Sequence, residues 1–276
     1  MRKYLIPLLT LVLVAFVSCQ KEIDWGWNTS GQKLVKARSI SGSDSTVITY
    51  AYDGSDRLVN VVTVGVQGTT TLDMTLTINR NSSGVINTTV QKGAALLSAG
   101  IDSLVTLYYY NTSTSQYTAS TFNITVGGFT VTDSAVYTAD AGGRITNELH
   151  YLISGIIPPF QAAENIYTYT GQNVVTVATA AAANPGDPLS AASNLSYTFD
   201  SKTAPLALKN EGILLGMVGF TDANNATKAD YSDLNDPTQN FTFDYTYKYN
   251  SSNKPDSSYS TKTPGGIITA SKFYYQ

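Results

Sequence analysis

Apolar and polar residues alternate along most of this chain with a period of two. The clearest stretch runs from Phe241 to Tyr249, where five aromatic residues fall on one face and Thr, Asp, Thr and Lys fall on the other. A stretch from Leu72 to Ile78 repeats the pattern with Leu, Met, Leu and Ile against Asp and Thr. Successive side chains of a β-strand point to opposite faces, so this alternation predicts strands that each bury one face.

Small polar turns separate the predicted strands at a regular interval. Asp or Asn, or a Thr directly before Gly, opens them at positions 53, 79, 111, 140, 170, 200 and 250, so the successive steps are 26, 32, 29, 30, 30 and 50 residues. Asp and Asn side chains accept hydrogen bonds from the backbone two residues on. A unit of about 30 residues holds two strands and two connections. The sequence therefore predicts an all-β fold, an antiparallel meander of β-hairpins that forms a curved open sheet or a barrel-like structure.

The long last step predicts an insertion at 201–240. The apolar spacing at 206–217 is that of one short helix, and residues 221–239 are expected to form a polar loop. The strand pattern starts near position 46, so residues 46–276 are predicted to be a single β-repeat domain.

A different pattern opens the chain. Arg2 and Lys3 precede an apolar run from Leu5 to Val17 that ends at Cys19. A helix of this length rises about 20 Å, which is less than the roughly 30 Å hydrocarbon core of a bilayer. The run therefore predicts a cleaved export signal rather than a transmembrane helix.

The sequence around the single cysteine resembles a bacterial lipobox, in which the thiol is acylated and the chain is cut just before it. The resemblance implies a signal peptide at 1–18 and a lipidated Cys19 that begins a tether at 19–45. Several acyl chains on one residue anchor a protein stably, since each buried CH₂ contributes about 0.8 kcal/mol. Gln20–Asp24 resembles the tether of surface lipoproteins in Bacteroidota, so we expect a lipid-anchored outer-membrane protein on the cell surface or the periplasmic face. An ordinary secretory signal beside an incidental cysteine is the alternative.

Composition narrows the functions open to this chain. Charged residues make up 13% of the sequence, the net charge is −3, and there is one Cys and one His. So little positive charge makes nucleic acid a poor partner. A single Cys and a single His exclude disulfide frameworks, Cys/His zinc sites and any chemistry that needs two histidines. We expect no cofactor, and the oligomeric state stays open.

Two sets of motifs resemble known families. Tyr50–Leu58 and Tyr137–Ile145 each join a tyrosine, an Asp-opened turn and an Arg before Leu or Ile, which resembles the tyrosine–aspartate (YD, or RHS-type) repeats. Residues 46–276 are similar to a group of Bacteroidota lipoproteins of unknown function, the DUF4595-like group, in their repeats, their leucine-rich insertion and their final Tyr-rich hairpin. The resemblance implies a sheet-dominated, barrel-like or open curved fold and supplies no catalytic residues.

One pair of residues could act in catalysis. Glu148 and His150 share a strand face with Leu152, but the sequence shows no nucleophile or glycine elbow nearby. We therefore predict a solvent-facing Glu–His pair and no catalytic site.

The predicted loop at 221–239 is rich in oxygen ligands, which suit calcium. Asp222 and Asn224 precede the candidate calcium ligands, which are Asp230, Asp233 and Asp236. Their spacing departs from the EF-hand, so the sequence favours a solvated acidic loop without a metal.

Surface modification and the tyrosines give two further predictions. Ser45, Ser103 and Ser134 each follow an Asp in triplets that resemble the O-glycosylation sites of exported Bacteroidota proteins, and this resemblance predicts O-glycosylation there. The chain holds 19 tyrosines, which we expect on the core face of a broad sheet. The alternative is a surface that stacks carbohydrate or binds protein.

These observations predict an envelope-anchored lipoprotein, most simply a non-enzymatic module that binds glycan or protein or contributes to envelope structure. Whether it is an enzyme stays open, with no site motif in favour. One alternative is a glycan-active hydrolase that uses carboxylates on a β scaffold. The other is a small outer-membrane β-barrel, because Phe241–Tyr249 is long enough to cross a bilayer when tilted.

Overall fold

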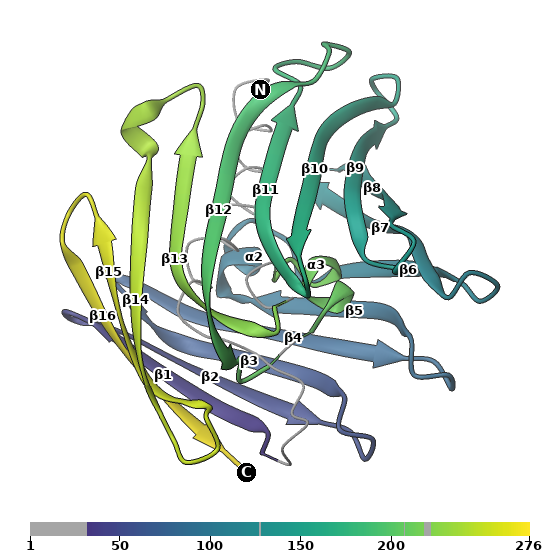
Figure 1. Cartoon of the computed structure of the whole chain (residues 1–276). Helices are drawn as coiled ribbons and strands as arrows, with labels where there is room; N and C mark the ends of the chain where they lie inside the picture. Colours follow the sequence, from purple (N-terminus) through teal and green to yellow (C-terminus); the bar gives the residue numbers. More distant parts are fainter. Residues whose placement is uncertain (1–31, 127, 207, 218–221) are drawn as a thin grey trace.

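The computed structural model describes residues 32–126, 128–206, 208–217 and 222–276, which fold into a closed antiparallel β-barrel (Figure 1). Within these residues sixteen strands follow one another as a meander, and the first strand pairs with the last to close the ring. The all-β meander of hairpins is confirmed, as a closed barrel rather than an open sheet. The export segment and Cys19 lie outside the described residues.

The strands are eight to fourteen residues long. In chain order they are β1 (Leu34–Ser41), β2 (Asp44–Tyr52), β3 (Leu58–Gln67), β4 (Thr70–Arg80), β5 (Ile86–Gly93), β6 (Leu104–Asn111), β7 (Gln116–Val126), β8 (Phe129–Ala139), β9 (Ile145–Ser154), β10 (Phe160–Thr170), β11 (Asn173–Ala181), β12 (Ser190–Thr203), β13 (Asn224–Asp233), β14 (Phe241–Tyr249), β15 (Pro255–Thr263) and β16 (Ile267–Tyr275). Short helical elements in the described chain are α2 (Ala94–Ser98), α3 (Asn210–Leu214) and η2 (Pro237–Gln239). No helix in this part of the chain is long and apolar enough to span a membrane.

Strand register decides which side chains face the barrel interior. Val61 of β3 pairs with Leu76 of β4, and both turn inward, whereas the next pair, Val62 with Thr75, turns outward. In an antiparallel ladder, paired residues lie on the same face, so the assignment extends from strand to strand around the barrel. Inward residues near one rim form the main hydrophobic core.

Turns that open with Asp or Asn connect the strands at this rim. The Asp53 carboxylate accepts hydrogen bonds from the backbone of Ser55 (2.8 Å) and Arg57 (3.0 Å). The same two bonds recur in the turns that open at Asn81, Asp140 and Asn250. In each turn the third residue after the opening one has a positive φ, which gives the list Asp56, Gly84, Gly143 and Asn253. This is the geometry of a short hairpin loop with a left-handed residue before the second strand.

The turn that was predicted to open at position 79 opens two residues later. Asn79 lies within β4 and donates a side-chain hydrogen bond to Thr88 of β5 (3.0 Å). Asn81 opens the turn instead. The turns placed at 53, 111, 140 and 250 are confirmed.

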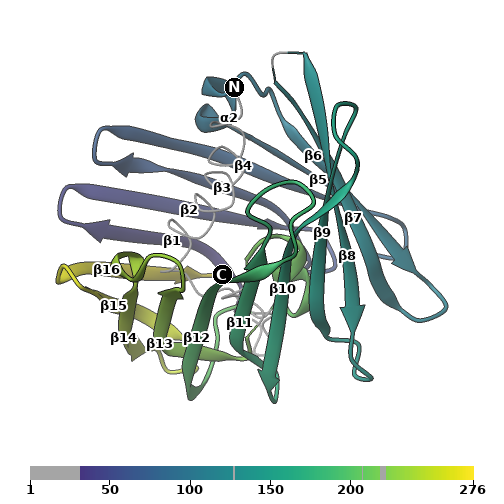
Figure 2. The ribbon, with the colours of Figure 1, turned by 90° about the horizontal axis from the view of Figure 1, so that it is seen from above.

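The segment after β12 folds into the barrel near the same rim (Figures 1 and 2). We call its described residues, 204–206 and 208–217, the plug, and the rim beside it the plugged rim. The plug contains α3, so the predicted helix at 206–217 is confirmed in a shorter form. Ile213 and Leu214 are 3% and 6% exposed and join one hydrophobic cluster with inward residues from separate parts of the wall, such as Ile48 and Val174.

Two segments expected to lack regular structure are barrel strands. The first, β1, lies within the predicted tether at 19–45, and the second, β13, lies within the predicted polar loop at 221–239. Lys228 and Asp230 of β13 turn outward, while Ala229 and Tyr231 turn inward. Because the outward face of β13 is polar, this strand has few apolar residues and is easily mistaken for a loop.

Candidate functional site in the barrel interior

A cluster of charged residues lies on the inner wall formed by β8 and β9. Asp133, Glu148 and His150 have side chains that are 7%, 12% and 14% exposed. Nδ1 of His150 lies 2.9 Å from Oδ1 of Asp133, and its Nε2 lies 3.4 Å from Oε1 of Glu148. The predicted solvent-facing pair is therefore wrong. The register of β9 on β8 sets His150 and Glu148 opposite the buried residues Ala135 and Tyr137, on the interior face.

Electrostatics fix the charge state of this cluster. Burial alone would lower the pKa of His150, but the charge of Glu148 and the hydrogen bond with Asp133 outweigh burial and raise this pKa well above 6.5. Burial alone would raise the pKa of Glu148, but attraction to His150 outweighs it and lowers this pKa below 4.5. At neutral pH His150 is therefore an imidazolium that pairs with the Glu148 carboxylate, and its Nδ1 contacts Asp133.

Neutral side chains complete the hydrogen bonds of Glu148. The hydroxyl of Tyr167 donates to its carboxylate at 2.7 Å, and the amide of Asn165 donates at 3.1 Å. His150 thus contacts two carboxylates, whereas the nearby hydroxyl of Ser120 bonds with Tyr137 (2.7 Å). The arrangement can orient a polar ligand, but it does not pair a nucleophile with a base.

Aromatic side chains occupy the whole inward face of β14. We call these five rings the aromatic row, which consists of Phe241, Phe243, Tyr245, Tyr247 and Tyr249. Neighbouring rings have centroids 5.5 to 6.4 Å apart. The row begins next to the loop at 234–240, at the rim opposite the plug, and ends at the Asn250 turn of the plugged rim. It therefore follows the height of the barrel.

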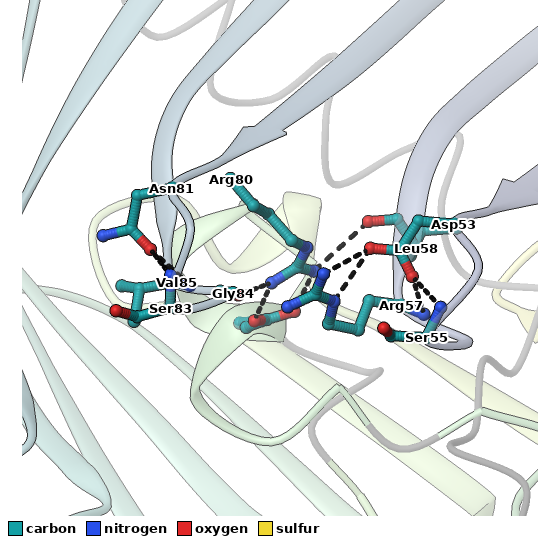
Figure 3. A network of polar contacts seen from close by, with 10 residues as sticks. Asp53, Ser55, Arg57, Leu58, Arg80, Asn81, Ser83, Gly84 and Val85 are labelled. Carbon is teal, nitrogen blue, oxygen red and sulfur yellow. Dashed lines mark hydrogen bonds and ion pairs between the residues drawn. The ribbon is translucent and has the colours of Figure 1, made fainter.

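An ion pair ties the plug to the wall (Figure 3). Both guanidinium Nη atoms of Arg80 lie 2.6 and 2.7 Å from the carboxylate oxygens of Glu211. The side chain of Arg80 is 5% exposed, and its Nη atoms also donate to the carbonyls of Leu58 (3.2 Å) and Gly84 (3.0 Å). Asn210 adds two hydrogen bonds to backbone at the β8–β9 turn. The plug is thus fixed by polar contacts as well as by packing.

The three candidate calcium ligands do not converge. Asp230 turns outward and bonds with Lys228 and Thr242, while Asp233 and Asp236 accept hydrogen bonds from their own loop. No group of three or more His, Cys, Asp or Glu among the described residues could hold a metal ion.

The serines predicted to be O-glycosylated lie at three places. Ser45 and Ser134 occupy outward positions on β2 and β8, and Ser103 precedes β6; all three are half-buried. Their O-glycosylation stays a prediction. Many tyrosines face inward as expected, among them the buried Tyr50 and Tyr167.

Outward charges are distributed unevenly around the barrel. The outward faces of β6 to β9 carry no charged residue in the described chain, and Val105, Leu107 and Tyr109 are exposed there. The outward charges lie on other strands, and they include Arg38 on β1, Asp244 on β14 and Lys272 on β16.

The described chain is therefore a sixteen-stranded barrel with a plugged interior that carries both aromatic and charged side chains. The fold is similar to that of a porin-like protein from Bacteroides uniformis ATCC 8492, with a TM-score of 0.52, 14% identity, and coverage of 88% of this chain and 98% of that one. It is also similar to a porin-like protein from Bacteroides vulgatus ATCC 8482, with a TM-score of 0.52, 9% identity, and coverage of 89% and 99%. At these identities the likeness concerns the fold. No family model and no curated protein matches the chain.

Proposed function

We propose that this protein is a non-enzymatic outer-membrane lipoprotein whose barrel stands in water beside the membrane and binds a ligand in its interior. The lipobox around Cys19 supports the anchor. One structural observation supports the rest: several strands carry charged residues on their outward face near mid-strand, while the aromatic row lies inside.

Outward charges on several strands interrupt the apolar band that lipid requires. A barrel in a bilayer presents an apolar band outward, and Arg or Lys at the midplane costs about 2–4 kcal/mol. Here Arg38, Asp244 and Lys272 lie outward near the middle of their strands. The aromatic row and the main core lie inside. Water suits these outward charges better than lipid does.

The interior suits a binding role. Ligand sites combine apolar and aromatic lining with a few fixed polar groups. The aromatic row supplies the aromatic lining, and the cluster of Asp133, His150 and Glu148 supplies the fixed polar groups. A ligand narrow enough to enter a barrel is a glycan or another small molecule rather than a folded protein.

A barrel that spans the outer membrane is the second candidate. The similarity to porin-like proteins and the uncharged outward faces of β6 to β9 favour it. Such a barrel would need an apolar band on all sixteen strands, and the outward charges on β1, β14 and β16 weigh against it.

Purification without detergent separates the two candidates. The barrel closes within the described residues, so a chain that starts at Gln20 contains all of its strands. We expect this chain to elute from gel filtration in buffer as one sharp species with a β-sheet spectrum. A chain that aggregates until detergent is added would support the spanning barrel.

The anchor has its own test. The full-length chain expressed in a bacterial host that acylates lipoproteins should incorporate labelled palmitate, and Cys19→Ala should abolish the label. Equal labelling of both chains would overturn the anchor while leaving the barrel's solubility untouched.

A further inference from the structure

Strands β6 to β9 form one side of the barrel, and in the described chain their outward side chains are apolar, hydroxyl or amide groups (Figure 2). We call this outward surface the neutral face. Its exposed apolar residues, which are 40% to 49% exposed, are Val105, Leu107, Tyr109, Val136 and Ile153. Single apolar residues are common on a surface in water, but a surface that gathers several of them without a charge marks a contact with a partner.

The neutral face is also hollowed. An open cavity of about 210 Å³ lies over β6 and β7, and its lining includes Val105, Leu107 and Thr121. A cavity of about 150 Å³ holds benzene, so this one has room for an aromatic ring. A hollow among exposed apolar side chains gives an aromatic side chain of a partner a defined place to pack.

Exposed apolar residues elsewhere on the wall lie beside charges. On β3, Val64 is 44% exposed, as Leu107 is, but it pairs with Asp73 of β4. A partner that covered Val64 would also remove the Asp73 carboxylate from water, which is costly. On the neutral face no described charge has to be buried in this way.

Charges of opposite sign border the neutral face. Lys92 turns outward on β5 at one margin, and Glu164 turns outward on β10 at the other. Lys92 lies six positions along β5 from Ile86, and Glu164 lies six positions before Thr170, the last residue of β10. Both strand ends lie at the plugged rim, so the two charges lie at about the same height on the wall.

We propose that two copies of this chain associate through their neutral faces, side by side, with both plugged rims on the same side. A twofold axis along the barrels turns β10 of one copy toward β5 of the other. Glu164 of each copy then meets Lys92 of the other, and these long side chains bridge the gap between two curved walls. The inference goes beyond the proposed function, because it needs a barrel in water but no ligand.

The same axis brings β9 of one copy to the hollow of the other. Tyr151 lies six positions from Ile145, the plugged-rim end of β9, and Val105 lies six positions from Asn111, the plugged-rim end of β6. Tyr151 turns outward, since it pairs with the outward Ser134. The Tyr151 ring of one copy is therefore the side chain placed to fill the hollow beside Val105 of the other.

The area of the neutral face and the position of the tether agree with this arrangement. Four strands about 4.8 Å apart and about 30 Å long cover about 580 Å², so two copies would bury about 1,150 Å², near the lower limit for a specific interface. Lys33 lies beside Gln276 at the plugged rim. With both plugged rims on one side, the tethers of both copies reach the same membrane.

Sedimentation equilibrium of the chain that starts at Gln20, between about 1 and 100 µM, tests this interface, and we expect a reversible monomer–dimer equilibrium. Leu107→Lys puts a charge on the neutral face at the edge of the hollow and should weaken the dimer at least about tenfold. Val64→Lys is the matched control, because Val64 is equally exposed on β3 and lies outside the neutral face. It should leave the dimer unchanged.

A charge exchange tests the parallel arrangement. Glu164→Lys sets two cations opposite each other at each margin and should weaken the dimer about threefold or more. Adding Lys92→Glu restores opposite charges and should recover the dimer. An antiparallel pair sets Lys92 against Lys92, so a double variant without recovery would overturn the parallel arrangement.

The remaining outcomes separate this interface from the proposed function. A wild-type chain that is monomeric at the highest concentration, or a Leu107→Lys chain that dimerises as the wild type does, overturns the interface and leaves the proposed function intact. A monomer that floats with phosphatidylcholine vesicles, and fails to do so as Leu107→Lys, assigns the neutral face to lipid and also overturns the dimer. A chain that stays in solution only with detergent overturns the dimer and the proposed function together.

Discussion

At the scale of single residues, the interior charges of this barrel occur in compensated groups. His150 lies between two carboxylates, and Arg80 is bound by both oxygens of Glu211. Removing one member of such a group leaves an uncompensated charge, which costs more than the pair itself contributes. These residues therefore give sharp stability predictions.

The charge state of His150 predicts how stability changes with pH. Because its pKa is raised in the folded protein, its contribution is complete below about pH 6.5 and is lost as the pH rises through the folded value. We expect the free energy of unfolding, measured with urea between about pH 6 and pH 9, to fall as the pH rises. His150→Gln should be less stable at pH 6 and should flatten this slope. A wild-type curve without slope in this range would contradict the prediction.

The Arg80–Glu211 pair predicts a strongly non-additive double-mutant cycle. Glu211→Gln leaves the buried Arg80 charge without its partner and should cost about 3 kcal/mol in the free energy of unfolding. The double variant Arg80→Met with Glu211→Leu should recover most of this loss. Asp230→Asn breaks an exposed pair with Lys228 and should cost less than about 1 kcal/mol. Equal losses for the buried and the exposed pair would show that the contact does not hold the plug.

At the scale of elements, the hairpin turns and the plug both stabilise the plugged rim. In the Asp53 turn, hydrogen bonds from the backbone and side chain of Arg57 lower the pKa of Asp53 to about 2. The Asp53 carboxylate thus stays ionised at neutral and mildly acidic pH. The plug adds the apolar surface against which the inward residues of this rim pack.

Shortening a buried side chain of the plug should destabilise the barrel without changing its strand pairing. Ile213→Ala removes a side chain that is 3% exposed, and we expect a loss of about 2–5 kcal/mol in the free energy of unfolding. Leu97→Ala on α2 is the control, because Leu97 is 59% exposed and should change stability by less than about 0.5 kcal/mol. Thermal and urea denaturation of both variants check this. Similar losses at the two sites would mean that the plug is not part of the core.

At the scale of the whole molecule, the strand alternation and the repeating turns are enough to predict an all-β meander, and the apolar spacing at 206–217 predicts the helix within the insertion. Three features depend on the closed ring and could not be read from the chain. The pairing of β1 with β16 joins residues more than two hundred positions apart. Asp133 meets His150 only through the register of β8 on β9. The inward direction of Glu148 is ambiguous locally, because the opposite face of β9 carries Leu149 and Tyr151, which look more like core residues.

The two ends of the described chain are joined by a pair of backbone hydrogen bonds, from Lys33 N to Gln276 O (3.0 Å) and from Gln276 N to Lys33 O (2.9 Å). If Cys19 carries the acyl chains, the fourteen residues from Cys19 to Gln32 can span at most about 50 Å, and Lys33, which follows them, lies beside Gln276 at the plugged rim. The tether would then attach on the side of the plugged rim, so this rim would face the bilayer and the opposite rim would face the medium. A fluorescent tag fused after Gln276 would lie on the membrane side of the barrel. A tag inserted in the 182–189 loop would lie on the opposite side, which faces the medium.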